Sequence, residues 1–346
     1  MVTTGGTETK RAPSAGVTMA EIARLAGVSA PTVSKVINGR SEVGAATRAL
    51  VQQVLHEHGY QHRKRAAKGS ALIELMFHEL AGVYPVEIIN GVGSVADEHN
   101  LAVVVSESQG RHTPRRGWLE GVLARRPTGV IPVFSDLSAE QRTRLTASQI
   151  PCVVLDPTGV PDDGVPSVGA TNWHGGLSAT RHLLELGHRR IAIITGPSLA
   201  LCSRARLDGY RAALDAAGIP IDTALVRDGK FEIEGGRANA ADLLALPEPP
   251  TAIFALNDGM AIGVYHAASQ AGLRIPQDLS VVGFDDYSLD AWLVPPLTTV
   301  RQPLSDMGAA AARMVLELAR GDQLRSRRCE LATELIVRSS TAPPAR

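Results

Sequence analysis

The chain has 346 residues, with 35 basic and 35 acidic side chains, and 44% of its residues are hydrophobic, which is ample for packed cores. This length corresponds to about two to three domains of ~100–200 residues each. Three cysteines, Cys152, Cys202 and Cys329, are odd in number, lie far apart and form no metal pattern, so we expect reduced thiols and no metal. No apolar run reaches the ~18 residues of a membrane span and no signal peptide is visible, so we expect a cytoplasmic protein without a membrane partner.

The charges are unevenly distributed along the chain. Residues 1–69 hold ten Lys and Arg side chains but only four Asp and Glu side chains, and the rest of the chain has the opposite surplus. A basic first part on an acidic body indicates an anionic partner, such as nucleic acid, at one end of the molecule. Residues 1–16 and the tail from Thr341 are predicted to be disordered.

Residues 17–40 predict two short helices joined by a tight turn. Thr18 and Glu21 have the spacing of a capping box, Gly27 can end the first helix, and Ser29 can cap the second. Such a helix-turn-helix can place its second helix in the major groove of DNA. The alternative is an ordinary helical hairpin.

A third amphipathic helix is predicted at residues 47–58, and Gly59 and Tyr60 follow it. The three helices resemble the headpiece of the LacI family of transcriptional regulators. The most specific matches are residues 23–39, which read ARLAGVSAPTVSKVING, and the closing Gly59-Tyr60. The resemblance implies an all-α DNA-binding domain at residues 17–60, followed by a basic hinge at 61–70.

The resemblance also implies which residues contact DNA. Ala30 and Pro31 occupy the main base-reading positions and Lys35 a third, so Lys35 is expected to supply much of the hydrogen-bonding specificity. Phosphate contacts are expected from Thr18, Thr32, Ser34 and Asn38, and hinge contacts from Arg63, Lys64 and Arg65. The hinge departs from the family pattern, since it has no leucine to wedge into the minor groove, and it is predicted to bind electrostatically and bend DNA little.

From residue 71 onward, short apolar strands alternate with helices. Strands are predicted at 71–77, 101–107, 129–134, 152–156, 190–196, 251–257, 279–285 and 330–337, and helices at 86–99, 114–125, 138–149, 175–186, 204–217, 235–246, 259–271 and 304–320. Strands this apolar are buried on both faces, so the fold class after the headpiece is α/β, with two doubly wound parallel-sheet lobes.

This body resembles the type I periplasmic-binding-protein fold, as it occurs in the LacI family. The matching motifs are GHRRIA (187–192), RLDGY (206–210), ND (257–258), VVGFDD (281–286) and PPLTTV (295–300). The resemblance spans about residues 17–340. It implies an effector-binding and dimerisation domain at 71–340, with lobe 1 at about 71–169 and 302–332 and lobe 2 at about 170–301 and 333–340.

In open α/β sheets, ligands bind beyond the carboxyl ends of the strands. Polar side chains at such positions include His78, Glu107, Asp156, Asn172, Asn257 and Asp285. Carboxylates accept two hydroxyl donors and a guanidinium donates a fork, so such a set with an arginine suits a polyol or sugar. The resemblance implies effector contacts from Pro85, Asp156, Arg206, Phe231, Asn257 and Asp285, and Trp173 is added because of its predicted loop position alone. Asp258 and Asp286 have the alternative role of capping a helix or turn.

These features favour a sequence-specific DNA-binding regulator. We expect a homodimer that binds a pseudo-palindromic operator and represses carbohydrate genes, with an affinity that a small sugar changes. The alternative is a co-repressor-dependent repressor, or an activator, that responds to a non-sugar metabolite. An enzyme would need a phosphate-binding turn after Phe77, where the sequence reads HELAGVYP, and neither catalytic residues nor a cofactor are predicted. An exported binding protein would need a signal peptide and would not carry a basic helix-turn-helix.

Overall fold

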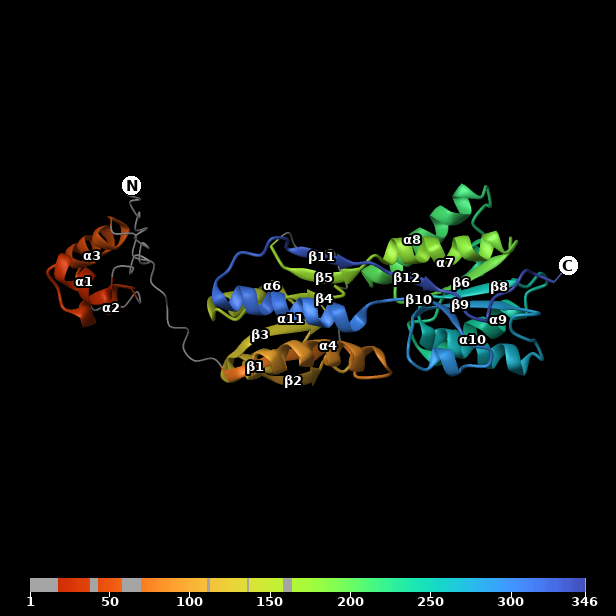
Figure 1. The fold of residues 1–346 in the computed structure, drawn as a ribbon, viewed down its shortest axis with the longest axis horizontal. Helices are drawn as coiled ribbons and strands as arrows, with labels where there is room; N and C mark the ends of the chain where they lie inside the picture. The colour runs from red at the N-terminus through yellow and green to blue at the C-terminus, as the bar shows by residue number, and fades with distance from the viewer. Residues whose placement is uncertain are drawn as a thin grey trace, which may run out of the picture. The chain divides into compact units, whose positions relative to one another are not determined.

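The computed structural model describes residues 18–37, 43–57, 70–110, 113–135, 137–157 and 164–345. The chain forms two compact units, Met1–Lys68 and Gly69–Arg346 (Figure 1). The predictions for residues 1–16, Asn38, Arg63, Lys64 and Arg65, including the hinge without a wedge, lie outside the described residues.

The first unit contains three helices, α1 (Met19–Leu25), α2 (Ala30–Ile37) and α3 (Ala45–Glu57). The predicted capping box is confirmed, because the Thr18 N–H donates to a Glu21 carboxylate oxygen at 2.7 Å and the Glu21 N–H donates to Thr18 Oγ1 at 3.3 Å. Gly27 turns the chain with a φ of 64°, and the side chain of Ser29 accepts from the Thr32 N–H at 3.3 Å. The buried face of the three helices consists of Ile22, Ala23, Ala26, Val33, Val36, Val51 and Val54.

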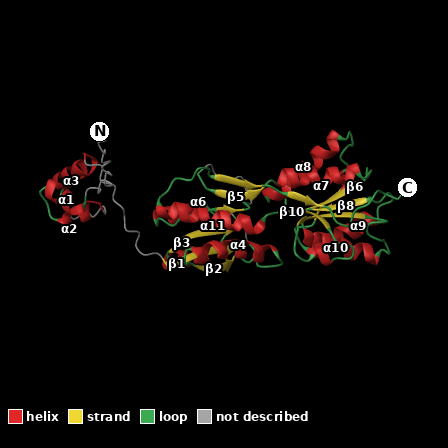
Figure 2. Ribbon diagram, viewed as in Figure 1, coloured by secondary structure: helices red, strands yellow, loops and turns green. Residues whose placement is uncertain are grey.

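The second unit contains two six-stranded sheets, and we call each sheet with its helices a lobe (Figure 2). The lobe 1 sheet has the order β11-β5-β4-β3-β1-β2, and all of its strand pairs are parallel. Its strands are β1 (Ser70–Phe77), β2 (Ala102–Glu107), β3 (Pro127–Val133), β4 (Val154–Leu155), β5 (Ser167–Ala170) and β11 (Arg328–Leu331). Its helices are α4 (Tyr84–Glu98), α5 (Arg116–Arg125), α6 (Ala139–Ala147) and α11 (Leu304–Arg320).

The lobe 2 sheet has the order β12-β10-β9-β8-β6-β7, in which β12 alone runs antiparallel to its neighbour. Its strands are β6 (Ile191–Thr195), β7 (Val226–Asp228), β8 (Ala252–Ala255), β9 (Ser280–Asp285), β10 (Thr298–Arg301) and β12 (Glu334–Ile336). Its helices are α7 (Asn172–Glu185), α8 (Leu201–Ala216), α9 (Ile233–Leu244) and α10 (Asp258–Gln270), with short 3-10 turns at Thr223–Leu225 and Asp290–Trp292.

The central strands β1, β3, β6, β8 and β9 are largely buried, as their apolar sequences predict, whereas the edge strand β2 is only partly buried. In β3, Val130 packs in a cluster with α5 and α6, whereas the next residue, Ile131, packs in the cluster that includes α4 and α11. Alternating side chains of a strand point to opposite faces, so helices cover each face of this sheet. None of the helices within the described residues is both long and apolar enough to cross a membrane.

Three predictions about the body were wrong. The predicted strand 330–337 is two strands, β11 in lobe 1 and β12 in lobe 2, because the chain crosses between the lobes at Ala332 and Thr333. The strands β5, β7 and β10 were not predicted, since each has only three or four residues. The tail from Thr341 is not disordered: Thr341 Oγ1 lies 2.9 Å from His182 Nε2, and the Ala342 carbonyl lies 2.9 Å from His188 Nε2.

The chain passes between the lobes three times. The crossing segments run from β5 to α7, from β10 to α11 and from β11 to β12. The first and third are joined, because the Thr333 N–H donates to Thr171 Oγ1 at 2.9 Å and the two threonine hydroxyls lie 3.0 Å apart. We call these three crossing segments the inter-lobe hinge, which is separate from the basic hinge at residues 61–70.

Candidate functional site

Arg206 lies at the centre of a buried polar cluster between the two sheets. Its side chain projects from α8 and the residue is 2% exposed. Nε donates to Asn172 Oδ1 at 2.8 Å, and Nη1 donates to the carbonyl of Leu256 at 2.5 Å, just beyond β8. The guanidinium carbon lies 3.6 Å from the centroid of the Phe284 ring, which is a cation–π contact. These contacts fix the direction of the guanidinium before any ligand arrives.

Asp285 faces Arg206 from the carboxyl end of β9. Its Oδ1 lies 3.9 Å from Arg206 Nη1 and accepts from Gln302 Nε2 at 2.6 Å. Burial raises the pKa of the Asp285 carboxyl to about 7, although Arg206 opposes the shift. The negative charge of Asp258 adds to the increase. The Asp285 carboxyl is therefore easier to protonate than a carboxyl group in water.

Asp156 occupies the corresponding position in lobe 1, directly after β4. Its Oδ2 accepts from the hydroxyl of Tyr84 at 2.8 Å. Burial raises the pKa of Asp156, and Arg206 and Tyr84 act in the opposite direction. Tyr84 and the buried Pro85 form the first turn of α4. The single guanidinium of Arg206 thus acts on a carboxylate from each lobe.

Aromatic rings join the lobes beside these charges. Phe231 of lobe 2 and Phe134 of lobe 1 meet edge to face, with ring centroids 6.0 Å apart. The guanidinium carbon of Arg206 lies 5.9 Å from the Phe231 centroid, and His78 meets Phe134 at 5.8 Å. The rings offer apolar surface next to the polar groups, which is the combination that binds the faces and hydroxyls of a sugar.

Asn257 has a structural role in addition to its predicted one. It is the N-cap of α10, where Oδ1 accepts from the Met260 N–H at 2.8 Å, while Nδ2 donates to the carbonyl of Phe231 at 3.0 Å. Both ends of the amide therefore hold the backbone around Phe231 and the start of α10. A ligand that contacts Asn257 would meet a side chain whose position is fixed by these two hydrogen bonds.

Trp173 does not lie in a loop, and that prediction was wrong, because α7 begins at Asn172 rather than at residue 175. The indole is on the first helical turn, 40% exposed, and packs against His174 at 5.1 Å between centroids. Among the described residues, no hydrogen bond, ion pair or ring contact joins the indole to Arg206, Asp156 or Asp285.

Four residues of this cluster were not among the predicted effector contacts: Tyr84, Phe134, Asn172 and Gln302. Asn172 follows β5 and was visible as a polar residue at a strand end. Gln302 follows β10, so prediction of that strand would have revealed it. Tyr84 and Phe134 carry no comparable signal, because aromatic residues at helix and strand ends are usually core residues.

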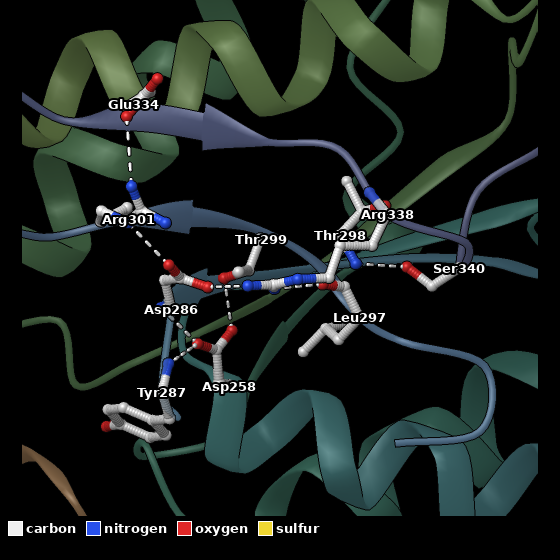
Figure 3. Close-up of polar contacts among 10 residues, drawn as sticks. All are labelled: Asp258, Asp286, Tyr287, Leu297, Thr298, Thr299, Arg301, Glu334, Arg338 and Ser340. Atoms are coloured by element: carbon white, nitrogen blue, oxygen red, sulfur yellow. Dashed lines mark hydrogen bonds and ion pairs between the residues drawn. The ribbon is translucent and has the colours of Figure 1, made fainter. Parts of the chain in front are cut away.

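Beneath the cluster, Asp258 and Asp286 organise the turn that follows β9 (Figure 3). The Asp258 carboxylate accepts the N–H of Asp286 at 2.6 Å, the N–H of Tyr287 at 3.3 Å and the hydroxyl of Thr299 at 2.6 Å. Capping of a turn, the alternative considered for both residues, is thus confirmed for Asp258. Asp286 instead forms ion pairs, with Arg301 at 2.7 Å and with Arg338.

In the first unit, α2 presents most of the residues predicted to contact DNA. Ala30, Pro31 and Lys35 are exposed, and Thr32 and Ser34 are partly exposed, while Val33 and Val36 are buried on the opposite side. Thr18 is exposed at the start of α1, where its hydroxyl also donates to Glu21 at 2.9 Å. Within the described ranges, no three His, Cys, Asp or Glu side chains gather in a way that could hold a metal ion.

Family models match both parts of the chain. Residues 18–62 match the model for bacterial regulatory proteins of the lacI family, and residues 180–341 match a periplasmic binding protein-like domain. The transcriptional regulator DegA of Bacillus subtilis is 32% identical and covers 94% of this chain and 98% of that protein. The ribose operon repressor of Escherichia coli is 34% identical and covers 93% of this chain and 99% of that protein.

Solved structures of regulators are also similar. The regulator CelR in complex with cellobiose is 33% identical, with a TM-score of 0.72, and covers 94% of this chain and 99% of that one. A regulator from Enterococcus faecium with bound ribose is 26% identical, with a TM-score of 0.73, and covers 79% of this chain and 100% of that one. The lac repressor dimer bound to operator is 30% identical, with a TM-score of 0.68, and covers 95% of this chain and 100% of that one.

Proposed function

The chain belongs to the LacI family of bacterial transcriptional regulators, and from this premise we propose that it is a repressor whose operator affinity is controlled by a monosaccharide bound between its two lobes. Arg206 carries the proposal, because its Nη1 lies 3.9 Å from Asp285 Oδ1 of lobe 2 and its charge also opposes the rise that burial causes in the pKa of Asp156 of lobe 1. A ligand with adjacent hydroxyls would donate to both carboxylates and accept from the guanidinium, so it would link the two lobes.

The same arrangement favours a small ligand. Phe134 and Phe231 are already in edge contact at 6.0 Å, so a ring placed between them requires a limited opening, and two linked rings require a larger one. Two relatives support the same class, because one is named a ribose operon repressor and another structure holds ribose. A disaccharide is the second candidate, since another similar regulator was solved with cellobiose.

Of the residues assigned to effector binding, we keep Pro85, Asp156, Arg206, Phe231, Asn257 and Asp285, and add Tyr84, Phe134, Asn172 and Gln302. Trp173 is the weakest member because of its place on α7. The alternative, a co-repressor-dependent repressor or an activator with a non-sugar effector, uses the same pocket and differs in the sign of the coupling.

The exposed face of α2 supports sequence-specific DNA binding by a homodimer on a pseudo-palindromic operator. We assign base contacts to Ala30, Pro31 and Lys35. Replacement of Lys35 by Ala should weaken operator binding by ~1–3 kcal/mol and relax one symmetric base-pair position. Equal weakening on operator and random DNA would show that Lys35 contacts only phosphate. Such a regulator acts on the chromosome in the cytoplasm and needs no catalytic activity.

The deciding experiment combines ligand binding with operator binding. The full-length protein would be used to select its operator from a random DNA library, and D-ribose and cellobiose would then be titrated by calorimetry and added to operator-binding assays. We expect D-ribose to bind and to lower operator affinity about tenfold or more, a typical allosteric coupling. Tighter operator binding with the sugar would mean that the sugar acts as a co-repressor rather than as an inducer. Failure of both sugars to bind would contradict the sugar assignment.

A further inference from the structure

The turn that presents Asp285 has an unusual backbone. Asp285 and Asp286 follow one another with φ values of 126° and 60°, a region that side chains other than glycine rarely adopt. Two such residues in succession persist only where their surroundings hold them. Asp285 is held by Gln302 and faces Arg206, whereas Asp286 is held by Arg301 and Arg338.

Arg301 connects this turn to two hinge segments. Its Nε donates to Asp286 Oδ2 at 2.7 Å, and its Nη1 lies 3.5 Å from Glu334 Oε2 (Figure 3). Arg301 is the last residue of β10, immediately before the segment that crosses to α11, and Glu334 is the first residue of β12, immediately after the segment that leaves β11. The side chain of Arg301 therefore ties together the points at which two crossing segments enter lobe 2.

The neighbouring residue, Gln302, extends the connection into the pocket. Two successive residues of one crossing segment, Arg301 and Gln302, contact two successive residues of the turn, Asp286 and Asp285. A ligand that moves the Asp285 carboxylate consequently acts on the second crossing segment through Gln302 and on the third through Arg301 and Glu334. The third segment is in turn bonded to the first through Thr333 and Thr171.

The turn has other anchors besides Arg301. Asp286 retains an ion pair with Arg338, whose backbone N–H donates to Thr298 Oγ1 and whose Nη1 donates to the Leu297 carbonyl. Asp258 independently holds the backbone of the turn. Arg301 is 49% exposed at its side chain, so its removal leaves no cavity in the core. Its distinctive feature is that it bridges the turn and Glu334.

We propose that Arg301 is a positioning residue that couples occupancy of the Asp285 pocket to the hinge, so that it controls how strongly the effector changes operator affinity rather than how tightly the effector binds. This proposal rests on the proposed function. Loss of the bridge should change the coupling factor between effector and operator but leave the effector dissociation constant nearly unchanged. A purely structural defect would change both quantities together.

The test uses the full-length protein, its selected operator and D-ribose as the probe. In Arg301→Gln we expect the dissociation constant for D-ribose to change less than about threefold, while the ratio of operator affinities without and with saturating D-ribose falls at least fivefold toward one. Glu334→Gln should give the same separation to a smaller degree, and Arg301→Lys should restore part of the coupling. The matched control is Arg211→Gln, which breaks an exposed ion pair with Asp208 on α8 and should leave both quantities unchanged.

If D-ribose fails to bind the wild-type protein, that result would count against the proposed function alone. The role of Arg301 can then be tested by a measurement without ligand. Amide hydrogen exchange of the empty protein should become at least fivefold faster in Arg301→Gln for peptides that cover residues 285–288 and 301–304, with lobe 1 core strands unaffected. Unchanged exchange in these peptides, or a wild-type coupling factor in Arg301→Gln, would overturn the proposal. So would a loss of D-ribose affinity as large as the loss of coupling.

Discussion

The two lobes have sheets of similar layout but differ in what they bury. In lobe 1 the buried charged residues among the described ones are Glu74 and Asp156, whereas lobe 2 buries Arg206, Asp258, Asp285 and Asp290, with His188 in addition. Lobe 2 also supplies the hydrogen bonds that orient Arg206 and Asp285, except for that from the crossing residue Gln302. Lobe 1 contributes a carboxylate and two aromatic side chains.

This difference indicates an order of events in effector binding. A pre-oriented polar site binds ligand at lower entropic cost than a site whose groups must first be arranged. We therefore expect the effector to bind first to lobe 2 and lobe 1 to close over it. Four predictions test this asymmetry, beginning with the largest expected effect.

Removal of matched carboxylates should affect effector binding unequally. Asp285→Ala removes the acceptor that Gln302 and Arg206 hold in lobe 2, and we expect an affinity loss of about 100-fold or more, since hydrogen bonds to charged groups contribute ~1.5–3 kcal/mol each. Asp156→Ala removes the lobe 1 acceptor, which only Tyr84 holds directly, and we expect a loss of about tenfold. Calorimetry with D-ribose measures both, and an equal or larger loss in Asp156→Ala would contradict binding to lobe 2 first.

Among the described residues of lobe 1, Glu74 is the one buried charge outside the Arg206 cluster. Breaking its ion pair should lower the free energy of unfolding. Glu74 on β1 is fully buried and forms hydrogen bonds at 2.7 and 2.8 Å with Nη2 of Arg125, whose side chain is 40% exposed. In Arg125→Ala the carboxylate loses its partner, and the free energy of unfolding should fall by ~3 kcal/mol.

Urea unfolding followed by tryptophan fluorescence, to which Trp118 on the same helix as Arg125 contributes, would measure this loss. The matched control is Arg144→Ala, which breaks the exposed pair with Glu120 and should cost less than ~1 kcal/mol. Equal losses in the two variants would show that Glu74 tolerates burial without Arg125.

Burial of Asp290 in lobe 2 should make the protein less stable above about pH 6 than in more acidic solution. The buried carboxyl group of Asp290 lies beside that of Asp258, and burial raises the pKa of Asp290 to about 6. Burial also raises the pKa of the neighbouring Asp258. A raised carboxyl pKa gives stability that is present below the unfolded value of ~3.9 and is lost as pH rises through the folded value. Stability from Asp290 should therefore fall as the pH rises through about 6.

Asp290→Asn removes this dependence and supplies an amide donor to Asp258. We expect the Tm of the variant to exceed that of wild type by a few degrees at pH 8, with a smaller difference at pH 5. Calorimetric scans of the empty protein at both values would measure it. A lower Tm in Asp290→Asn at pH 8 would mean that the ionised carboxylate has a stabilising partner in solution.

The smallest effect concerns the C-terminal segment, which packs on lobe 2 only. Thr341→Val removes the hydroxyl that lies 2.9 Å from His182 Nε2, and the free energy of unfolding should fall by about 1 kcal/mol or less. Thr143→Val, on the exposed face of α6 in lobe 1, serves as the control and should be near neutral. No loss in Thr341→Val would indicate that the tail does not stabilise lobe 2.

Features that depend on residues close together in the sequence were predicted more accurately than features that depend on distant residues. The capping box at Thr18, the turn at Gly27 and the cap at Ser29 are set by residues within four positions of each other, and the sequence predicted them correctly. The helix 304–320 was predicted with its observed bounds, because its apolar face repeats clearly and Gly321 ends it with a φ of 84°. Short strands were harder to predict, because the sequence of β10 shows no pattern that distinguishes it from a loop.

Within the pocket, strand ends located Asp156, Asn257 and Asp285, because the carboxyl ends of parallel strands meet at one edge. Trp173 was placed wrongly in a loop, because α7 begins at Asn172, earlier than predicted, and Trp173 is therefore part of the helix. Tyr84 and Phe134 were missed because their roles depend on contacts with Asp156 and Phe231, which lie 72 and 97 positions away along the chain.

The amino-acid sequence by itself determined the helix-turn-helix, the alternation of buried strands and helices, and the polar residues at the strand ends, because each depends on neighbours in sequence or on burial of a periodic apolar face. Only the tertiary structure decided that the predicted strand 330–337 is two separate strands, that Asn257 holds the start of α10, and that Arg301 bridges Asp286 and Glu334. These features join segments far apart in the chain, and a carboxylate has no preferred partner until folding has buried it beside one.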